Sequence, residues 1–164
     1  MATKSSPRGT AAILALVAAG VEHTVHPYEH AAANEVGYGL EAAQVLGIPA
    51  EQVYKTLMTE VDGALTVAVV PVTGKLDLKA LAGAVGGKKA AMADRAAAER
   101  ATGYVVGGIS PLGQKTAHPT VVDETIELYD TVYVSGGRRG LDVGLAPVDL
   151  IALTGAVVAD IARG

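Results

Sequence analysis

The chain has 164 residues, half of them hydrophobic, and a formal net charge of -4 at pH 7. This length is enough for one domain with a sizeable core. The absence of cysteine excludes disulfides, thiolate metal ligands and a cysteine nucleophile. The negative charge argues against indiscriminate binding along a nucleic-acid backbone, but it leaves room for a locally basic pocket.

The first expected element is a helix over residues 11–19, with Pro7 before it and Gly20 as its stop signal. Lys4 and Arg8 precede this apolar run, as basic residues precede the apolar part of a signal peptide. No A-x-A triplet follows the run, and it is too short to span a bilayer. We therefore expect a docked N-terminal helix, no membrane contact and a cytoplasmic protein.

The next elements are predicted from hydrophobic periodicity and from turn residues. Asp62-Gly63 lies between two apolar runs and is the strongest short signal for a β-hairpin. The expected elements are a strand at 21–28, a helix at 39–46, and the two hairpin strands at 53–61 and 64–71.

In the second half of the chain, Asp77 and Asp94 are expected helix caps and Pro147 starts a further helix. The expected elements are helices at 77–85, 94–100 and from 147, a turn or short helix at 124–129, and strands at 120–123, 131–135, 141–145 and 156–160. Several strands follow one another without regular βαβ alternation. This order predicts an α+β fold, with residues 1–164 as a single compact domain built on a mixed, mostly antiparallel sheet with helices packed around it.

Two glycine-rich stretches are the first candidates for a binding site. GYVVGGISPLG covers residues 103–113, and VSGGRRGLDVG covers residues 134–144. Each is a β-branched run that breaks into a glycine pair, so the backbone can lie close to a ligand. The first resembles a phosphate loop but has Gln114 where such a loop has lysine, and Pro111 removes a backbone donor. We therefore do not expect an NTPase.

Three histidines in HTVHPYEH are candidates for metal ligation. In an extended chain His26 and His30 share a face with Tyr28, whereas His23 points to the other face. The three ligands converge only if Pro27 bends the chain. We favour surface histidines and expect no metal.

Lys55 and Asp142 each interrupt a row of apolar residues on a predicted strand. An ammonium at position 55 must reach solvent, pair with a carboxylate, or receive an anionic or carbonyl-bearing ligand. An unpaired carboxylate at position 142 is costly, so it implies a partner among Lys55, Arg138 and Arg139. A Lys55–Asp142 pair could form a polar pocket floor or a purely structural ion pair, and spacing alone leaves both alternatives open.

Taken together, VYKTL, GYVVGGISPLGQK, HPT, YVSGGRRGLDV and the terminal VADIAR resemble the YbaK/EbsC family of aminoacyl-tRNA deacylases. The similarity runs from the N-terminal helix to the C-terminus. It is similar to the type that acts on Cys-tRNA(Pro), within a superfamily that includes the editing domain of prolyl-tRNA synthetases and free-standing Ala-tRNA(Pro) deacylases.

The resemblance implies a set of site residues. The lysine of the V-[FY]-K-T-L motif corresponds to Lys55, the tyrosine of Y-E-H to Tyr28, and the aspartate after the second loop to Asp142. These three are the candidate catalytic residues. The candidate substrate-binding residues lie in the two loops and are Gly107, Gly108, Ile109, Ser110, Pro111, Ser135, Gly136, Gly137 and Arg138.

The resemblance also implies the reaction, which is hydrolysis of the ester between a mischarged amino acid and the terminal adenosine of tRNA(Pro), without metal or cofactor. Lys55 holds the terminal phosphate or ribose, the glycine loops supply backbone donors, and the thiol of a cysteinyl substrate assists. The implied partners are the tRNA(Pro) acceptor end and prolyl-tRNA synthetase, with the protein a monomer or weak homodimer. The expected tRNA contacts are Lys55, Lys88, Lys89, Lys115, Arg138 and Arg139.

Two departures from the family's pattern affect tRNA contacts more than chemistry: Thr116-Ala117-His118 after Lys115, and the loop at residues 31–39. A side chain at Gly107 or Gly108 is expected to cost activity before it costs stability. The alternatives are an Ala-tRNA(Pro) deacylase and a non-catalytic module that binds tRNA ends or a synthetase.

Overall fold

A five-stranded mixed sheet lies at the centre of the computed structural model, which describes residues 9–29 and 38–164. Its strand order is β5-β2-β3-β6-β9. The β2-β3 and β2-β5 pairs are antiparallel, whereas the β3-β6 and β6-β9 pairs are parallel. The strands are β2 (Tyr54–Val61), β3 (Ala64–Pro71), β5 (Ala90–Met92), β6 (Thr120–Asp123) and β9 (Val157–Ala159).

The hairpin between β2 and β3 forms where it was predicted. Asp62 and Gly63 have φ values of 50° and 85°, the paired positive angles of a tight two-residue turn. The turn sets the register, so that Lys55 lies opposite Val70. β3 is buried along most of its length, as expected for a strand apolar on both faces.

A second, three-stranded antiparallel sheet has the order β1-β8-β7, with β1 at His23–Pro27, β8 at Leu141–Leu145 and β7 at Val132–Arg138. The predicted end of β7 at residue 135 was wrong. A bulge between Ser135 and Arg138 lets the strand continue through the second glycine stretch. Gly137 takes a φ of 109° there, which a residue with a side chain rarely adopts. The second glycine loop is therefore a bulged strand.

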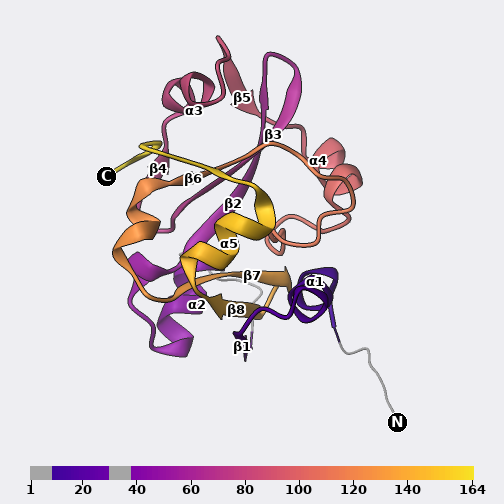
Figure 1. Cartoon of the computed structure of the whole chain (residues 1–164), viewed down its shortest axis with the longest axis vertical. Helices are drawn as coiled ribbons and strands as arrows, with labels where there is room; N and C mark the ends of the chain where they lie inside the picture. The colour runs from indigo at the N-terminus through magenta and orange to yellow at the C-terminus, as the bar shows by residue number, and fades with distance from the viewer. Residues whose placement is uncertain (1–8, 30–37) are drawn as a thin grey trace.

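Five α-helices surround the two sheets in the described part of the chain, and most end where the sequence predicts (Figure 1). The side chains of Asp77 and Asp94 accept the N–H groups of Ala80 and Ala97 as helix caps. Gly103 ends its helix with a φ of 82°. The helices are α1 (Ala11–Ala19), α2 (Tyr38–Leu46), α3 (Leu78–Ala84), α4 (Arg95–Thr102) and α5 (Pro147–Thr154).

The five-stranded sheet separates two buried clusters, because alternate residues of each strand face opposite sides. Tyr54 and Met58 of β2 belong to the larger cluster, together with residues of α1, α4, α5 and the three-stranded sheet. Leu57 and Val61 face the smaller cluster under α3. By the same alternation, Lys55 lies on the face of β2 that carries Leu57 and Val61.

The C-terminal segment is fixed to β6 by a buried carboxylate. Asp123 is 1% exposed, and its Oδ1 accepts the N–H groups of Ile161 and Ala162 at 3.0 and 2.9 Å. Beyond this point β10 (Ala162–Arg163) pairs with β4 (Lys75–Leu76). These two-residue strands, and β5, were not predicted, because such short segments carry no readable periodicity.

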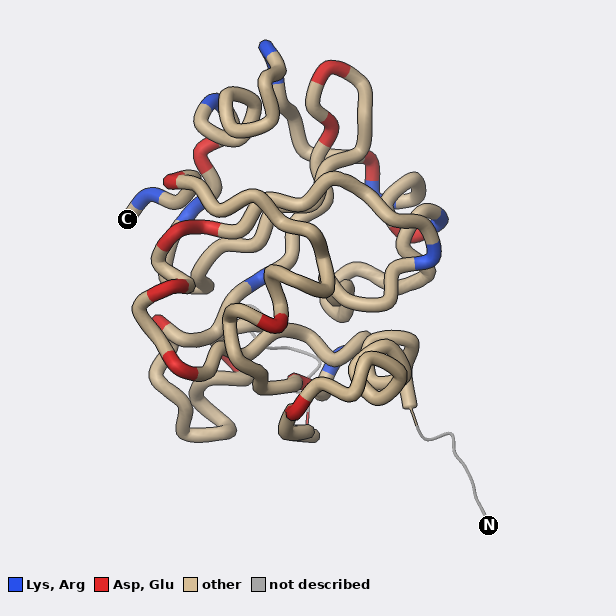
Figure 2. The backbone as a smooth tube through the Cα atoms, in the orientation of Figure 1, with Lys and Arg blue, Asp and Glu red and all other residues tan. Residues whose placement is uncertain are grey.

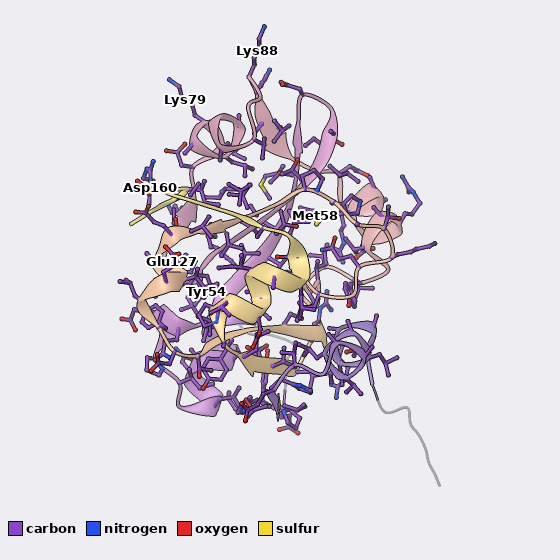
Figure 3. The ribbon with its side chains drawn as sticks, in the orientation of Figure 1. Tyr54, Met58, Lys79, Lys88, Glu127 and Asp160 are labelled. Carbon is purple, nitrogen blue, oxygen red and sulfur yellow. The ribbon has the colours of Figure 1, made fainter. Side chains whose placement is uncertain are left out.

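Charge is distributed unevenly over the described residues. Several red segments gather along β6 and the 3-10 helix η3 (Glu124–Leu128) in Figure 2. Lys79 and Lys88 point outward at the opposite end from α1, as Figure 3 shows. Within the described ranges, none of the helices has both the length and the apolar character needed to cross a membrane.

Candidate functional site

A cavity of about 520 Å³ lies beside β2, between the two sheets. Val53 and the start of β2 supply its longest continuous wall, residues 53–58, and most of the remaining lining is apolar. Seven of the predicted site residues line this cavity, and they are Tyr28, Lys55, Gly107, Ile109, Ser135, Arg138 and Asp142. The cavity thus brings together side chains that are more than 110 positions apart in the sequence.

One edge of β2 is open along this cavity. β5 pairs with β2 at residues 59–61, and the N–H of Ala93 donates to the carbonyl of Met58 at 3.0 Å. β5 does not extend further toward the start of β2. The part of β2 that carries Lys55 and Thr56 therefore lines the cavity.

Lys55 is partly buried in the cavity wall. Burial lowers the pKa of its ammonium, and the neighbouring charge of Lys75 lowers it further. Within the described ranges, the ion pairs join Arg95 to Glu99 and Arg163 to Asp77 and Asp160. The expected Lys55–Asp142 ion pair is thus not formed, and Lys55 faces the cavity without a carboxylate partner.

Asp142 is 6% exposed and lies on β8 between Ser135 of β7 and His26 of β1. Residues directly opposite in neighbouring strands share a face, so this polar row lies on one side of the three-stranded sheet. Burial raises the pKa of the Asp142 carboxyl to about 7. We expected a cationic partner for this group, and that expectation was wrong. A desolvated carboxyl can become neutral by a pKa shift instead of pairing.

Tyr28 lies close to Asp142. Burial raises the pKa of the Tyr28 hydroxyl to about 12, and the nearby carboxylates of Asp142 and Glu41 contribute to this rise. The backbone N–H of Tyr28 donates to the carbonyl of Gly140 at 2.9 Å, which fixes this residue to the turn between β7 and β8. Tyr28 therefore presents a protonated hydroxyl, a hydrogen-bond donor, at neutral pH.

The two glycine stretches pack directly on each other. A Cβ atom on Gly108 would lie 2.7 Å from the Cα of Arg138 and 2.9 Å from the backbone nitrogen of Arg139. The hydroxyl of Ser135 donates to the carbonyl of Gly108 at 3.0 Å and accepts the N–H of Gly137 at 3.1 Å. The absence of a side chain at position 108 therefore permits this backbone contact.

This contact corrects the expectation that a side chain at Gly108 costs activity before it costs stability. Gly108→Ala should lower the free energy of unfolding by about 1–3 kcal/mol, because the backbone of β7 cannot move aside cheaply. Urea unfolding monitored by circular dichroism measures this loss. Gly83→Ala is the control, because a Cβ there meets nothing within 4 Å. Equal stability of the two variants would contradict this prediction.

Both backbone polar groups of Val106, in the first glycine stretch, are hydrogen-bonded to other segments. Its N–H donates to the Glu99 carboxylate of α4 at 2.7 Å. Its carbonyl accepts from Nε and Nη2 of Arg139 at 3.1 and 2.7 Å. We expected Arg139 to contact tRNA, but its guanidinium is hydrogen-bonded to the first glycine stretch. Its neighbour Arg138 lines the cavity.

Not all of the predicted site residues line the cavity. Gly107 and Ile109 do, whereas Ser110 is fully buried and its hydroxyl accepts the N–H of Leu112 at 3.2 Å. The hydroxyl of Thr10 donates to the carbonyl of Gly136. The predicted residues outside the cavity lining are Gly108, Ser110, Pro111, Gly136 and Gly137.

The described histidines are engaged locally. His23 Nδ1 lies 2.8 Å from the carbonyl of Val21, and His26 Nε2 lies 2.7 Å from the hydroxyl of Thr24. His30 falls outside the described residues. In the ranges that the structure describes, no group of three His, Cys, Asp or Glu residues is placed to hold a metal.

Several lining residues were not predicted as part of the site. Thr56 and Met58 continue the wall that Lys55 begins, and Arg95 and Ala98 come from α4. Thr56 is the fourth residue of the VYKTL motif, so the motif itself was the available signal. Arg95 follows the helix cap Asp94, and only the packing of α4 brings it to the cavity.

Residues 36–153 match the model of the aminoacyl-tRNA editing domain family. The chain belongs to this family. EbsC of Enterococcus faecalis (strain ATCC 700802 / V583), which is named as a Cys-tRNA(Pro)/Cys-tRNA(Cys) deacylase, is 39% identical over 137 residues, or 82% of each chain. The resemblance found in the motifs is thereby confirmed.

Solved structures of this editing-domain shape agree with the fold. A crystal structure described as that of a trans-editing enzyme for prolyl tRNA synthetase superposes with a TM-score of 0.82 at 28% identity, covering 98% of this chain and 100% of the other. The structure of hypothetical protein APE2540 superposes with a TM-score of 0.83 at 26% identity, covering 94% and 100%. The predicted α+β class, mixed and mostly antiparallel, is confirmed.

Proposed function

We propose that this member of the editing-domain family is an aminoacyl-tRNA deacylase that hydrolyses mischarged tRNA(Pro), with Cys-tRNA(Pro) as its preferred substrate. The observation that carries the proposal is the unpaired Lys55 ammonium in the wall of a mostly apolar cavity. A partly desolvated cation attracts an anionic group strongly, because little water screens it. The relative named as a Cys-tRNA(Pro)/Cys-tRNA(Cys) deacylase supports the choice of cysteine.

Lys55 is assigned to the terminal phosphate or ribose of the tRNA. With no carboxylate paired to it, its charge is available to this part of the substrate. Arg138 lines the same cavity, is exposed, and offers a second cation at the mouth. These two residues would hold the acceptor end while the ester enters the cavity, so their contribution is positioning.

Asp142 and Tyr28 are assigned to the aminoacyl group. The α-ammonium of an aminoacyl ester is a cation, and the ionised Asp142 carboxylate is the acidic side chain in the cavity lining. The Tyr28 hydroxyl stays protonated beside it and can donate to the ester or ribose oxygen. This division places the positive end of the substrate near the buried carboxyl and the phosphate near Lys55.

Gly107 is the proposed backbone donor of the first glycine stretch. The N–H of Gly108 donates to the carbonyl of Val105 at 2.9 Å and is therefore occupied. Gly107 lines the cavity with a φ of 94°. A backbone donor placed near the ester carbonyl stabilises the charge that develops on its oxygen. The thiol of a cysteinyl substrate would then attack its own carbonyl carbon and lose its proton, the ester bond would break, and the ribose oxygen would leave as a hydroxyl. Water would hydrolyse the resulting thiolactone to free cysteine, so the protein need not supply a nucleophile.

Prolyl-tRNA synthetase is the proposed partner. Lys88 and Lys89 lie at a tip where the Asp62 carboxylate accepts both of their N–H groups at 3.0 Å, and Lys88 points outward (Figure 3). Among the described residues, the cations that line the cavity are Lys55, Arg95 and Arg138, so affinity for the tRNA body should be low. A synthetase that presents tRNA(Pro) would supply the missing selectivity.

The test is release of labelled amino acid from Cys-tRNA(Pro) and Ala-tRNA(Pro) by the purified protein. We expect cysteine to be released faster than alanine, and EDTA to leave both rates unchanged. Release of alanine alone would move the protein to the Ala-tRNA(Pro) deacylases. A gel shift with the acceptor stem but no time-dependent release would identify a non-catalytic binding module and overturn the proposal.

A further inference from the structure

Thr56 lines the cavity, and its side-chain hydroxyl is buried without a hydrogen-bond partner in the described structure. Among the described residues, its Oγ1 is the buried side-chain oxygen or nitrogen atom without a hydrogen-bond partner. Buried polar groups are nearly always hydrogen-bonded, because leaving one unpaired costs free energy. A threonine at a site that offers it no partner within the protein therefore needs a functional explanation.

The backbone of Thr56 is also directed toward the cavity side. Val72 donates its N–H to the carbonyl of Val53, so this pair is hydrogen-bonded in the β2-β3 ladder. Hydrogen-bonded and non-hydrogen-bonded pairs alternate along an antiparallel ladder, which makes Thr56 and Val69 a non-hydrogen-bonded pair. The N–H and C=O of Thr56 consequently face the edge of β2 that β5 leaves open.

The side chains near Thr56 on β2 define what the hydroxyl can bind. Tyr54 and Met58 project from the same face of the strand and lie in the body of the molecule (Figure 3). Both belong to the buried cluster that contains Ala98 and Ile109, and all four line the cavity. A hydroxyl among apolar groups suits a small, neutral, weakly polar group rather than an ion.

We infer that the hydroxyl of Thr56 is the group that distinguishes a thiol-bearing aminoacyl side chain from one that ends in a methyl group. This inference rests on the proposed function, which places an aminoacyl ester in the cavity. The α-ammonium binds Asp142 and the phosphate binds Lys55. The amino-acid side chain then lies in the apolar part of the cavity, beside Tyr54 and Met58. A thiol can exchange a hydrogen bond with the Thr56 hydroxyl, and a methyl group leaves that hydroxyl unpaired.

The experiment measures binding, so that it does not depend on turnover. The ligands are adenosine derivatives that carry cysteine or alanine through a 3'-amide, which is not hydrolysed as the ester is. Their dissociation constants are measured by calorimetry for the wild type and for Thr56→Val, which removes the hydroxyl but keeps the branched shape. We expect the wild type to prefer the cysteinyl ligand by about 10-fold, the size of one hydrogen bond, and Thr56→Val to lose this preference.

Two controls separate recognition from structure. Thr56→Ser keeps the hydroxyl and should retain the preference for the cysteinyl ligand. Thr59→Val removes a satisfied hydroxyl on the same strand, which donates to the carbonyl of Thr66 at 2.7 Å. It should keep the preference but unfold at a temperature about 2–4 °C lower. Thr56→Val, which loses no bond within the protein, should unfold at or above the wild-type temperature.

The outcomes are distinguishable. An unchanged cysteinyl preference in Thr56→Val, or equal binding of both ligands by the wild type, would overturn the role of Thr56. Loss of preference in Thr56→Val supports that role even if the wild type fails to deacylate tRNA, in which case only the proposed function falls. Failure of the wild type to bind either ligand would overturn both.

Discussion

Lys55→Ala should reduce the rate of Cys-tRNA(Pro) deacylation by about 100-fold or more, while the protein stays folded. The expected size is that of removing one preorganised charge or donor from a site that excludes water. The fold should tolerate the change, because Lys55 has no ion-pair partner in the described structure and its ammonium is partly desolvated. Single-turnover rates, with thermal unfolding measured in parallel, check both expectations.

Lys75→Ala is the matched control for Lys55→Ala. Lys75 is exposed, and its charge lowers the pKa of Lys55. If general positive charge near the cavity were enough, the two variants would lose activity equally. The proposed role of Lys55 requires near wild-type activity in Lys75→Ala. Wild-type activity in Lys55→Ala would show that Lys55 does not hold the substrate and only extends toward solvent.

Asp142 should make the reaction depend on pH. Its carboxyl titrates with a pKa of about 7, and in the proposed role only the ionised form holds the α-ammonium of the substrate. After subtraction of spontaneous hydrolysis, kcat/KM should rise with a midpoint near pH 7. Asp142→Asn should lose this rise and fall to about one-tenth of the wild-type value or less at pH 8. An identical pH profile in the variant would remove Asp142 from the site.

Ionisation of the same carboxyl should lower the stability of the folded protein as the pH rises, although it raises the activity. Its pKa is raised from the ordinary 3.8 to about 7, so the folded state holds the proton more tightly than the unfolded state. The carboxyl's contribution to stability is therefore full below the unfolded pKa and is lost as the pH rises through about 7. Asp142→Asn should gain stability relative to the wild type between pH 4 and pH 8, by a few kcal/mol at most, since one pKa unit corresponds to about 1.4 kcal/mol.

Local chemistry made much of the fold predictable from the sequence. Asp62-Gly63 determined the central hairpin, and Asp77 and Asp94 marked two helix starts, because each residue acts on its own neighbours in the chain. The motif around Lys55 led to the family that the comparisons confirm. The apolar row that Lys55 interrupts was also readable, since alternation follows from the strand backbone.

Long-range features could not be read in this way. The sequence does not reveal that β5 ends before the start of β2, so the open edge at Thr56 was missed. Spacing also did not show that burial would raise the pKa of Asp142 in place of an ion pair. The contact between Gly108 and Arg138 joins residues 30 positions apart and depends on a bulge in β7. Each of these features arises from packing between the two sheets.

We propose that the cavity beside β2 hydrolyses an aminoacyl ester held by Lys55. The most direct measurement is the time course of cysteine release from Cys-tRNA(Pro), with wild type and Lys55→Ala compared under single-turnover conditions. We predict release by the wild type well above the rate in buffer, and release near the buffer rate by the folded variant. Equal release by the two proteins, or none by either, would contradict the claim.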